Sequence, residues 1–228
     1  MMRKITKPHT PKQNKYIFTE GMDYSKTGRA SIWGKGDKDT VRILSKAKIS
    51  GKWLNLAAGD GRYNLYLLKK ADKVVASDID ESALSKLWHN TPEKYKKKLK
   101  IKNLDITKKL PFKSKSFDGV FCAGTLHIFP LKILERIVKE IDRVLAPGGK
   151  VIMDFASDIE RVRLDNKPYI IKDEPNYTLT ESRGVLKRLF RNYKISMYTS
   201  EVPEEILKEA NPPYRFSCKF IILVADKF

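Results

Sequence analysis

A short turn rich in glycine and alanine follows an apolar segment and has the composition of a ligand-binding loop. The strand-like residues 53–56 precede the turn, and an apolar helical pattern begins at about residue 62. Glycine has no Cβ, so the chain can adopt unusual φ and ψ angles there and let a ligand approach the backbone. A buried strand, a tight turn and a helix form the unit that binds phosphates or nucleotides in α/β folds. The small residues of this turn are Ala57, Ala58, Gly59 and Gly61.

An acidic residue ends the next strand-like segment, residues 73–78. An acid about 20 residues beyond a glycine turn, at the end of the next strand, can accept hydrogen bonds from the two hydroxyls of a ribose. Asp78 has this position, and Ile79 follows it. Asp80 is a second candidate for the ribose, although an acid there also caps the helix expected to begin next. The spacing predicts a ligand that contains a nucleoside.

The turn departs from the dinucleotide-binding fingerprint at its third small position. That fingerprint needs a small residue where the helix packs on the strand, and this sequence has Asn64 there. The stretch resembles instead the first motif of class I S-adenosylmethionine-dependent methyltransferases, whose ligand is a nucleoside without a pyrophosphate. Two residues differ from that motif: Asn55 replaces the usual acid at the end of the first strand, and Ala57 replaces the first glycine.

Further motifs extend the resemblance in the same order along the chain. Asp105 and Ile106, before Leu-Pro-Phe, resemble the residues that bind the adenine amino group and ring. Phe117-Asp118 resembles the start of the fourth strand. The segment Arg-Val-Leu-Ala-Pro-Gly-Gly-Lys at residues 143–150 resembles the turn that leads into the fifth strand. The resemblance covers about residues 50–156 and has the layout of a ubiquinone-biosynthesis-like methyltransferase domain.

The resemblance implies an α/β fold, a Rossmann-like doubly wound sheet of seven strands that is mostly parallel with the last strand antiparallel. The implied cofactor is S-adenosylmethionine, with S-adenosylhomocysteine as its product and no metal. Sequence patterns predict a sixth strand at residues 192–197 and a seventh at residues 216–224, whereas residues 158–176 are polar and irregular. The implied cofactor-binding residues are Ala57, Ala58, Gly59, Gly61, Asp78, Ile79, Asp105, Ile106, Ala123 and Gly124.

One histidine lies at the predicted ligand-binding edge of the sheet. His127 follows the fourth strand, at the end where ligands of open α/β sheets bind. Many relatives carry a histidine here, which could act as a general base for an alcohol or phenol. It could equally pack the loop or donate one structural hydrogen bond. His9, His89 and His127 are too scattered to indicate a metal site.

The chain divides into an N-terminal segment and one domain. We expect residues 1–36 to form a basic arm that covers the cofactor as a lid, and residues 37–228 to form a single methyltransferase domain. The lid residues that could contact the cofactor carboxylate are Tyr24, Lys26 and Arg29. Alternatively, the segment is a strap that packs Tyr24 and Trp33 on the body. In this family an insertion after the fifth strand walls the substrate pocket, and residues 157–177 would form it.

The tetrapeptide Asn211-Pro212-Pro213-Tyr214 resembles the catalytic loop of methyltransferases that act on amino groups of DNA, RNA or glutamine. In those enzymes the loop follows the fourth strand, whereas here it lies between the last two predicted strands. We therefore interpret it as a turn.

The charge is unusual for a chain of this length. The net charge is +19 over 228 residues, and nearly all of it lies in residues 1–150. Such asymmetry is typical of a nucleic-acid-binding face, and also of a lysine-rich solvated surface. No apolar run approaches the roughly 20 residues that cross a bilayer, the N-terminus does not resemble a secretory signal, and two cysteines do not indicate a disulfide framework. We expect a cytoplasmic protein without membrane insertion.

Together these observations favour a methyltransferase that acts on a small molecule. An RNA methyltransferase is the alternative that the basic charge favours. A non-catalytic cofactor-binding protein is the alternative that Asn55 and Ala57 favour. The acceptor atom and the oligomeric state stay open at this point.

Overall fold

The computed structural model describes residues 24–171, 174–208, 210 and 212–228. The strands are β1 (Lys52–Leu56), β2 (Lys73–Asp78), β3 (Leu99–Asn103), β4 (Phe117–Cys122), β5 (Leu145–Arg163), β6 (Tyr193–Leu207) and β7 (Tyr214–Lys227). The helices are η1 (Tyr24–Lys26), α1 (Lys38–Lys46), α2 (Asn64–Lys70), α3 (Glu81–Asn90), α4 (Glu93–Lys96), η2 (Leu126–Ile128), α5 (Leu131–Val144) and α6 (Leu179–Leu189). Residues 1–23 of the predicted arm, which was expected to span residues 1–36, and the predicted turn residue Asn211 lie outside the described residues.

A single sheet organises the fold, with the strand order β3-β2-β1-β4-β5-β7-β6. Neighbouring strands from β3 to β5 are parallel, and β7 is antiparallel to both β5 and β6. The predicted fold class, an α/β Rossmann-like doubly wound sheet of seven strands with an antiparallel last strand, is confirmed. The order reverses direction between β1 and β4, the place where ligands of such sheets bind.

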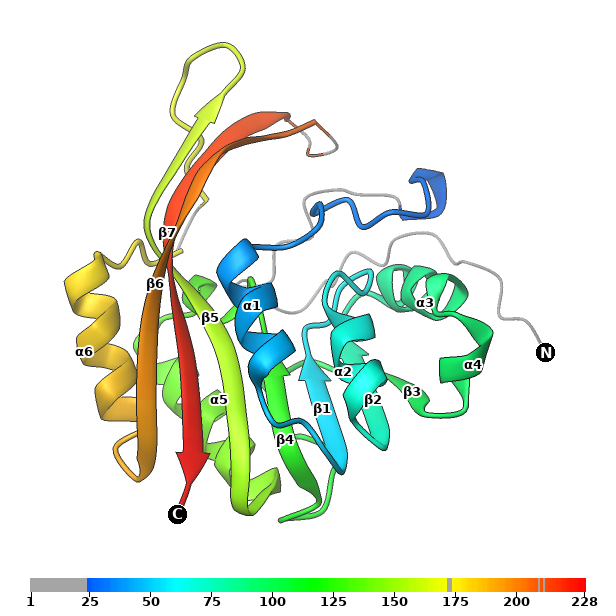
Figure 1. Cartoon of the computed structure of the whole chain (residues 1–228). Coiled ribbons are helices and arrows are strands. Elements are labelled where there is room, and N and C mark those ends of the chain that lie inside the picture. The colour runs from blue at the N-terminus through cyan, green and yellow to red at the C-terminus, as the bar shows by residue number, and fades with distance from the viewer. Residues whose placement is uncertain (1–23, 172–173, 209, 211) are drawn as a thin grey trace.

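Helices cover both faces of the sheet because its central strands are mainly apolar. β1 and β4 are buried along nearly their whole length, as expected for parallel strands packed on both faces. On one face Leu44 of α1 and Leu67 of α2 pack in one core cluster, and on the other Ile137 of α5 and Leu186 of α6 pack in a second. Figure 1 shows these two helical layers with the sheet between them.

Side-chain caps begin the helices where the sequence indicates. Asp37 accepts a hydrogen bond from Thr40 N at 2.7 Å and caps α1. Asp80 caps α3. Thr178 forms a capping box with Glu181 at the start of α6. Such caps satisfy N–H groups that the first turn of a helix leaves free.

The last three strands are longer than predicted. β5 continues to Arg163, through residues expected to be irregular, and β6 continues ten residues beyond its predicted end at residue 197. Register shifts between Ser157 and Glu160, and between Val202 and Glu205, explain the error. A bulge moves every later side chain to the other face, so the alternation that identifies a strand is interrupted. We call residues 156–163, 200–207 and 214–220 the strand extension; Figure 1 shows it rising above the helical layers.

The chain turns back after β5 and lies against the strand extension. Arg163 N donates to Lys167 O at 2.8 Å, and Tyr169 N donates to Arg161 O at 3.0 Å. We call residues 168–171 and 174–177 the return segment. The expected insertion at residues 157–177 therefore consists of the end of β5, a turn and this segment.

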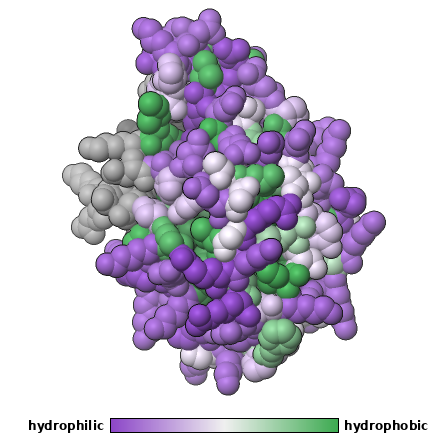
Figure 2. All heavy atoms as spheres, turned by 90° about the vertical axis from the view of Figure 1, so that its left-hand side faces the viewer, coloured by the Kyte–Doolittle hydropathy of each residue, from purple (hydrophilic) through white to green (hydrophobic). Residues whose placement is uncertain are grey.

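The outer face of α6 and β6 is mainly hydrophilic. Figure 2 shows hydrophobic side chains there as separate spots among polar ones. Tyr198 on β6 is 46% exposed and Ile206 is 50% exposed, and single exposed apolar residues of this kind are ordinary on protein surfaces. No helix in the described part of the chain is long and apolar enough to cross a membrane.

Candidate active site

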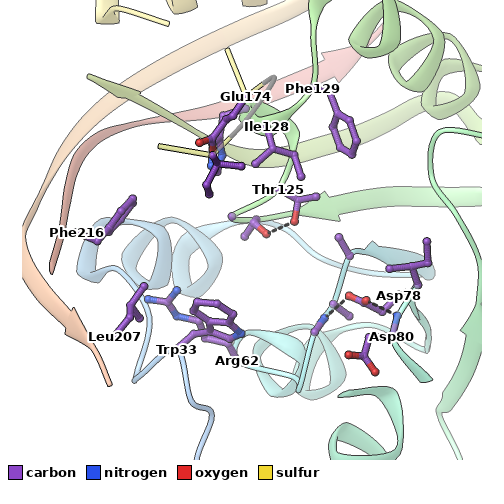
Figure 3. Close-up of a pocket in the computed structure, with 18 of the residues that line it drawn as sticks. Trp33, Arg62, Asp78, Asp80, Thr125, Ile128, Phe129, Glu174, Leu207 and Phe216 are labelled. Atoms are coloured by element: carbon purple, nitrogen blue, oxygen red, sulfur yellow. Dashed lines mark hydrogen bonds between the residues drawn. The ribbon is translucent and has the colours of Figure 1, made fainter. Parts of the chain in front are cut away.

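A cavity of about 530 Å³ lies between the carboxyl ends of β1, β2 and β4 and the strand extension. This volume is typical of small-molecule sites, which measure roughly 300–1,000 Å³. We call its two parts the sheet end and the extension end; Figure 3 shows Asp78 and Asp80 at the first, and Leu207 and Phe216 at the second. The sheet end is lined by Asn55, Ala57, Ala58, Gly59, Asp78, Ile79, Asp80, Leu104 and Ile106.

The glycine turn presents its backbone to the cavity. Gly59 has φ +51°, and a Cβ there would meet no atom closer than Trp33 Nε1 at 4.0 Å. Ala57 has φ +50°, the left-handed conformation that costs a residue with a Cβ about 1 kcal/mol. Gly61 does not line the cavity: a Cβ there would lie 2.9 Å from Leu87 Cγ, so this glycine permits helix packing.

Asp78 lies at the carboxyl end of β2 and faces the glycine turn. Its Oδ2 accepts a hydrogen bond from Gly59 N at 2.8 Å, and its Oδ1 accepts one from Asp80 N at 2.9 Å. Burial raises the pKa of Asp78 to about 6, although these backbone N–H groups oppose the shift. The Asp80 carboxylate accepts from Ser82 N at 2.8 Å as a helix cap. Asp78 is thus the carboxylate of this pair that is not used as a cap.

Asn55 and Asn64, which flank the glycine turn, are hydrogen-bonded to each other. Asn55 Nδ2 donates to Asn64 Oδ1 at 3.1 Å, and both side chains are buried. Asn55, which replaces the usual acid of the methyltransferase motif, therefore pairs with Asn64, which departs from the dinucleotide fingerprint. Asn55 also lines the cavity, so it contributes a neutral polar group to the cavity wall.

The remaining predicted cofactor residues divide into two groups. Ile79, Ile106, Ala123 and Gly124 line the cavity. Asp105 is not among the lining residues, because its Oδ1 turns back to accept from Thr107 N at 2.9 Å and Thr107 Oγ1 at 2.7 Å. Gly124 N donates to Asp154 Oδ1 at 2.5 Å, and burial raises the pKa of Asp154 to about 7.

A buried ion pair fixes residues 24–36 against the body of the protein. Lys86 Nζ lies 2.9 Å from Asp60 Oδ2, with both side chains almost fully enclosed. Asp60 also accepts from Ser31 Oγ at 2.7 Å and Ile32 N at 2.9 Å. Lys86 also donates to Thr27 Oγ1 at 2.8 Å. The sequence analysis missed this pair, since nothing in the spacing of the two residues relates them.

The predicted lid residues occupy different environments. Tyr24 is buried and lines the cavity together with Trp33. Burial, followed by the charges of Asp60 and Asp78, raises the pKa of Tyr24 far above its usual value. Lys26 and Arg29 are exposed and are not among the lining residues.

Arg62 is a cation of the cavity that the sequence analysis did not single out. Its guanidinium lies 5.3 Å from the centroid of the Tyr63 ring, and its Nε is enclosed without a partner among the described residues. Figure 3 shows Arg62 beside Trp33. A cation at the N-terminus of a helix opposes the helix dipole, so its position just before α2 was the available signal of a functional role.

His127 is buried in the wall of the cavity. It lines the cavity, and its Nδ1 has no hydrogen-bond partner among the described residues. Burial, followed by the charge of Arg161, lowers the pKa of His127 to about 3. The imidazole is therefore neutral at physiological pH and can donate or accept one hydrogen bond through each nitrogen.

The extension end combines aromatic side chains with one buried ion pair. Arg161 and Glu174 form this pair, and the sequence analysis did not single out either residue. The other residues that line this end come from the strand extension, the return segment and the loop after β4: Ile128, Phe129, Tyr169, Ile170, Ile171, Val202, Glu205, Leu207, Tyr214, Phe216 and Phe220. In the described part of the chain no three His, Cys, Asp or Glu side chains are grouped to hold a metal ion.

Comparison with known proteins relates the chain to methyltransferases. A methyltransferase domain family matches residues 54–153. The tRNA U34 carboxymethyltransferase of Nautilia profundicola is 32% identical over 102 residues, which cover 44% of this chain and 33% of that protein. Phosphoethanolamine N-methyltransferase 1 of Triticum aestivum is 26% identical over 152 residues, which cover 66% of this chain and 30% of that protein. The matches thus span about a third of each relative.

A solved structure agrees with the sequence matches. The complex of DhpI with S-adenosylhomocysteine superposes with a TM-score of 0.59 at 21% identity, over 82% of this chain and 81% of that chain. The matched family region contains the glycine turn, Asp78 and β4, and the shared fold extends over most of the sheet. Residues 54–153 therefore match a methyltransferase domain family, and the chain has the fold of solved S-adenosylmethionine-dependent methyltransferases.

Proposed function

We propose that this protein transfers a methyl group from S-adenosylmethionine to a small-molecule acceptor. The observation that supports this best is the open backbone of Gly59 beside the carboxylate of Asp78. The carboxylate oxygens of Asp78 accept backbone hydrogen bonds from Gly59 and Asp80 and have capacity for more. Two ribose hydroxyls would use this remaining capacity.

The same end of the cavity has groups suited to the other parts of the cofactor. The apolar side chains of Ile79, Leu104 and Ile106 line the wall next to Asp78 and suit an adenine ring. Arg62 is a partly buried cation whose Nε has no hydrogen-bond partner among the described residues, and it suits the carboxylate of the amino-acid part. We therefore assign the carboxylate contact to Arg62, in place of Lys26 and Arg29, with Tyr24 and Trp33 covering the ligand.

The protein would contribute mainly orientation and exclusion of water. S-adenosylmethionine supplies a methyl group that its sulfonium already makes electrophilic. Ala123 and Gly124 are small residues in the wall of the cavity, and they leave space for the two reactants. Positioning two reactants in this way removes a large entropic part of the barrier. His127, being neutral, would orient an acceptor by a hydrogen bond.

The distribution of charge favours a small molecule over RNA. Exposed lysines gather on α4 and β3, at the edge of the sheet opposite to β6. Lysines on an edge strand also prevent edge-to-edge association. The extension end comes instead from the part of the chain with balanced charge, so phosphates of an RNA at the acceptor position would meet acidic and basic side chains in nearly equal number. One relative is named for tRNA and another for phosphoethanolamine. These names alone do not decide between RNA and a small molecule as the acceptor.

Calorimetry tests the proposal directly. The purified chain, freed of nucleic acid, is titrated with S-adenosylmethionine and S-adenosylhomocysteine, and we expect dissociation constants in the micromolar range. Absence of binding by both would contradict the proposal. Transfer of labelled methyl groups from S-adenosylmethionine is then compared between a small-molecule extract and total RNA. Labelling of RNA alone would favour the RNA alternative, and binding without any labelling would favour the non-catalytic one.

A further inference from the structure

Aromatic side chains form much of the wall at the extension end of the cavity. The rings of Tyr169 and Tyr214 lie 4.7 Å apart at an angle of 47°. Phe129 and Phe220 are buried and line the same end. Aromatic walls bind planar rings by stacking and edge-to-face contact. An aliphatic or strongly hydrated acceptor would lose these contacts.

The arginine at this end is neutralised within the protein. Arg161 Nη1 lies 2.5 Å from Glu174 Oε2, and Arg161 Nη2 lies 3.0 Å from Glu174 Oε1. The two side chains are 10% and 7% exposed. This bidentate geometry gives the strongest class of side-chain hydrogen bonds. To bind both Nη groups, a carboxylate or phosphate ligand would have to displace Glu174, which would then be a buried charge without its partner. The Nε of Arg161, which has no partner among the described residues, is enclosed.

The other charges near the cavity do not offer an anion site at this end. Glu205 lines the extension end and adds a negative charge. Arg62 lies beside Trp33 and is assigned above to the cofactor. Among the described residues that line the extension end, Arg161 is therefore the sole cation, and Glu174 already binds it.

A neutral hydrogen-bonding group completes the extension end. His127 lines the cavity next to the aromatic wall, and its Nδ1 has no hydrogen-bond partner among the described residues. The Arg161 charge lies close enough to disfavour the imidazolium. His127 can therefore accept a hydrogen bond from a ligand hydroxyl without introducing a charge.

From these four observations we propose that the extension end selects an uncharged aromatic ligand with a hydroxyl group, and that Glu174 sets this selectivity by neutralising Arg161. The proposal rests on the proposed function, since it names the acceptor class of the same cavity. It concerns the binding of a ligand to residues of β5 and the return segment. Binding can be measured directly, so the proposal can be tested without methyl transfer.

Three naphthyl probes of nearly equal shape separate the contributions. Binding of 2-naphthol, naphthalene and 2-naphthoate to the full chain is followed by the fluorescence of the probe, in the presence of S-adenosylhomocysteine. We expect 2-naphthol to bind about tenfold more tightly than naphthalene, as one buried hydrogen bond implies. We expect 2-naphthoate to bind most weakly. Equal or tighter binding of 2-naphthoate would overturn the proposal.

The substitution Glu174→Gln tests the role of the ion pair. Glutamine keeps the shape of the side chain and removes its charge. The positive charge of Arg161 is then no longer neutralised, and the pair has a net charge of about +1. We expect the affinity for 2-naphthoate to rise about tenfold or more, while the affinity for 2-naphthol changes less than about twofold. We also expect 2-naphthoate to raise the melting temperature of this variant and not of the original protein. An unchanged preference in a folded variant would refute the role of Glu174.

A second substitution keeps the test decisive if Glu174→Gln does not fold. His127→Phe keeps a ring and removes the hydrogen bond, so the preference for 2-naphthol over naphthalene should disappear while naphthalene binding persists. Tyr198→Phe changes an exposed β6 side chain outside the cavity and should leave all three affinities unchanged. Affinity for S-adenosylhomocysteine is measured on every sample. Its absence in the original protein would contradict the proposed function, whereas its presence with no probe preference would contradict this inference alone.

Discussion

The two ends of the cavity are built in different ways. The sheet end uses backbone groups and short loops that follow consecutive strands, such as Gly59 after β1 and Asp78 at the end of β2. The extension end uses side chains from strands that are distant in the sequence, such as Arg161 on β5 and Phe216 on β7, which lie 5.4 Å apart from guanidinium carbon to ring centroid. A cofactor that many enzymes share can be bound by backbone groups of fixed geometry. A particular methyl acceptor requires particular side chains around it.

The largest effect should come from breaking the ion pair that fixes residues 24–36 over the sheet end. Lys86→Met leaves Asp60 as a buried charge without its partner. We expect the free energy of unfolding to fall by about 3 kcal/mol or more, measured by urea denaturation. Lys96→Met is the matched control, because Lys96 pairs with an exposed Glu93 and should cost less than about 1 kcal/mol. Equal effects of the two variants would show that the buried pair is unimportant.

The next effect concerns the ribose site. Asp78→Ala should weaken binding of S-adenosylhomocysteine about 100-fold, since hydrogen bonds to a charged acceptor contribute roughly 1.5–3 kcal/mol each. Calorimetry measures the change. Asp72→Ala is the control, because Asp72 precedes the same strand at its other end and should bind normally. Normal binding by Asp78→Ala would place the cofactor elsewhere.

The pH dependence of cofactor binding should report the same carboxylate. Burial raises the pKa of Asp78 to about 6, and the ionised form is the better acceptor for hydroxyl groups. Affinity should therefore be complete above pH 7 and fall as the pH drops through 6, by about tenfold for each further unit. Titrations between pH 5 and 8 in Asp78→Asn should lose this dependence. A flat profile in the original protein would contradict the assignment.

A smaller effect should distinguish the two parts of the cofactor. Arg62→Met should weaken binding of S-adenosylhomocysteine about tenfold, because a charged hydrogen bond to its carboxylate is lost. Methylthioadenosine has no carboxylate, so its affinity should stay the same. Arg42→Met, which changes an exposed arginine of α1, serves as the control. A similar loss for both ligands would indicate that Arg62 acts on the fold instead.

The smallest effect concerns the unusual residue of the glycine turn. Ala57→Gly should stabilise the protein by about 0.5 kcal/mol, because relief of the left-handed conformation exceeds the added entropy of the unfolded chain. Ala58→Gly should instead destabilise it by a similar amount, since φ of Ala58 is not positive. Thermal unfolding compares the two variants. A destabilised Ala57→Gly would show that the conformation of Ala57 carries no strain.

Much of the sheet end could be predicted from the sequence. Glycine turns, strand ends and caps depend on residues close together in the chain, so Gly59, Asp78 and the cap at Asp80 are recognisable by spacing. Asp105 was expected to line the cofactor site and does not line the cavity. Its carboxylate accepts a hydrogen bond from Thr107, two residues further on, and the spacing of residues alone does not predict such a side-chain orientation. The roles of these residues toward the cofactor stay predictions.

The sequence by itself determined the fold class, the order of the central elements and the nucleotide-type turn, because apolar periodicity and glycine placement act locally. Tertiary structure alone decided three features: the pairing of Asp60 with Lys86, the pairing of Arg161 with Glu174, and the length of β5 to β7. Bulges interrupt the strand pattern, and a buried ion pair between segments leaves no periodic signal. The extension end of the cavity depends on these contacts, because side chains that are distant in the sequence meet there only when the sheet is assembled.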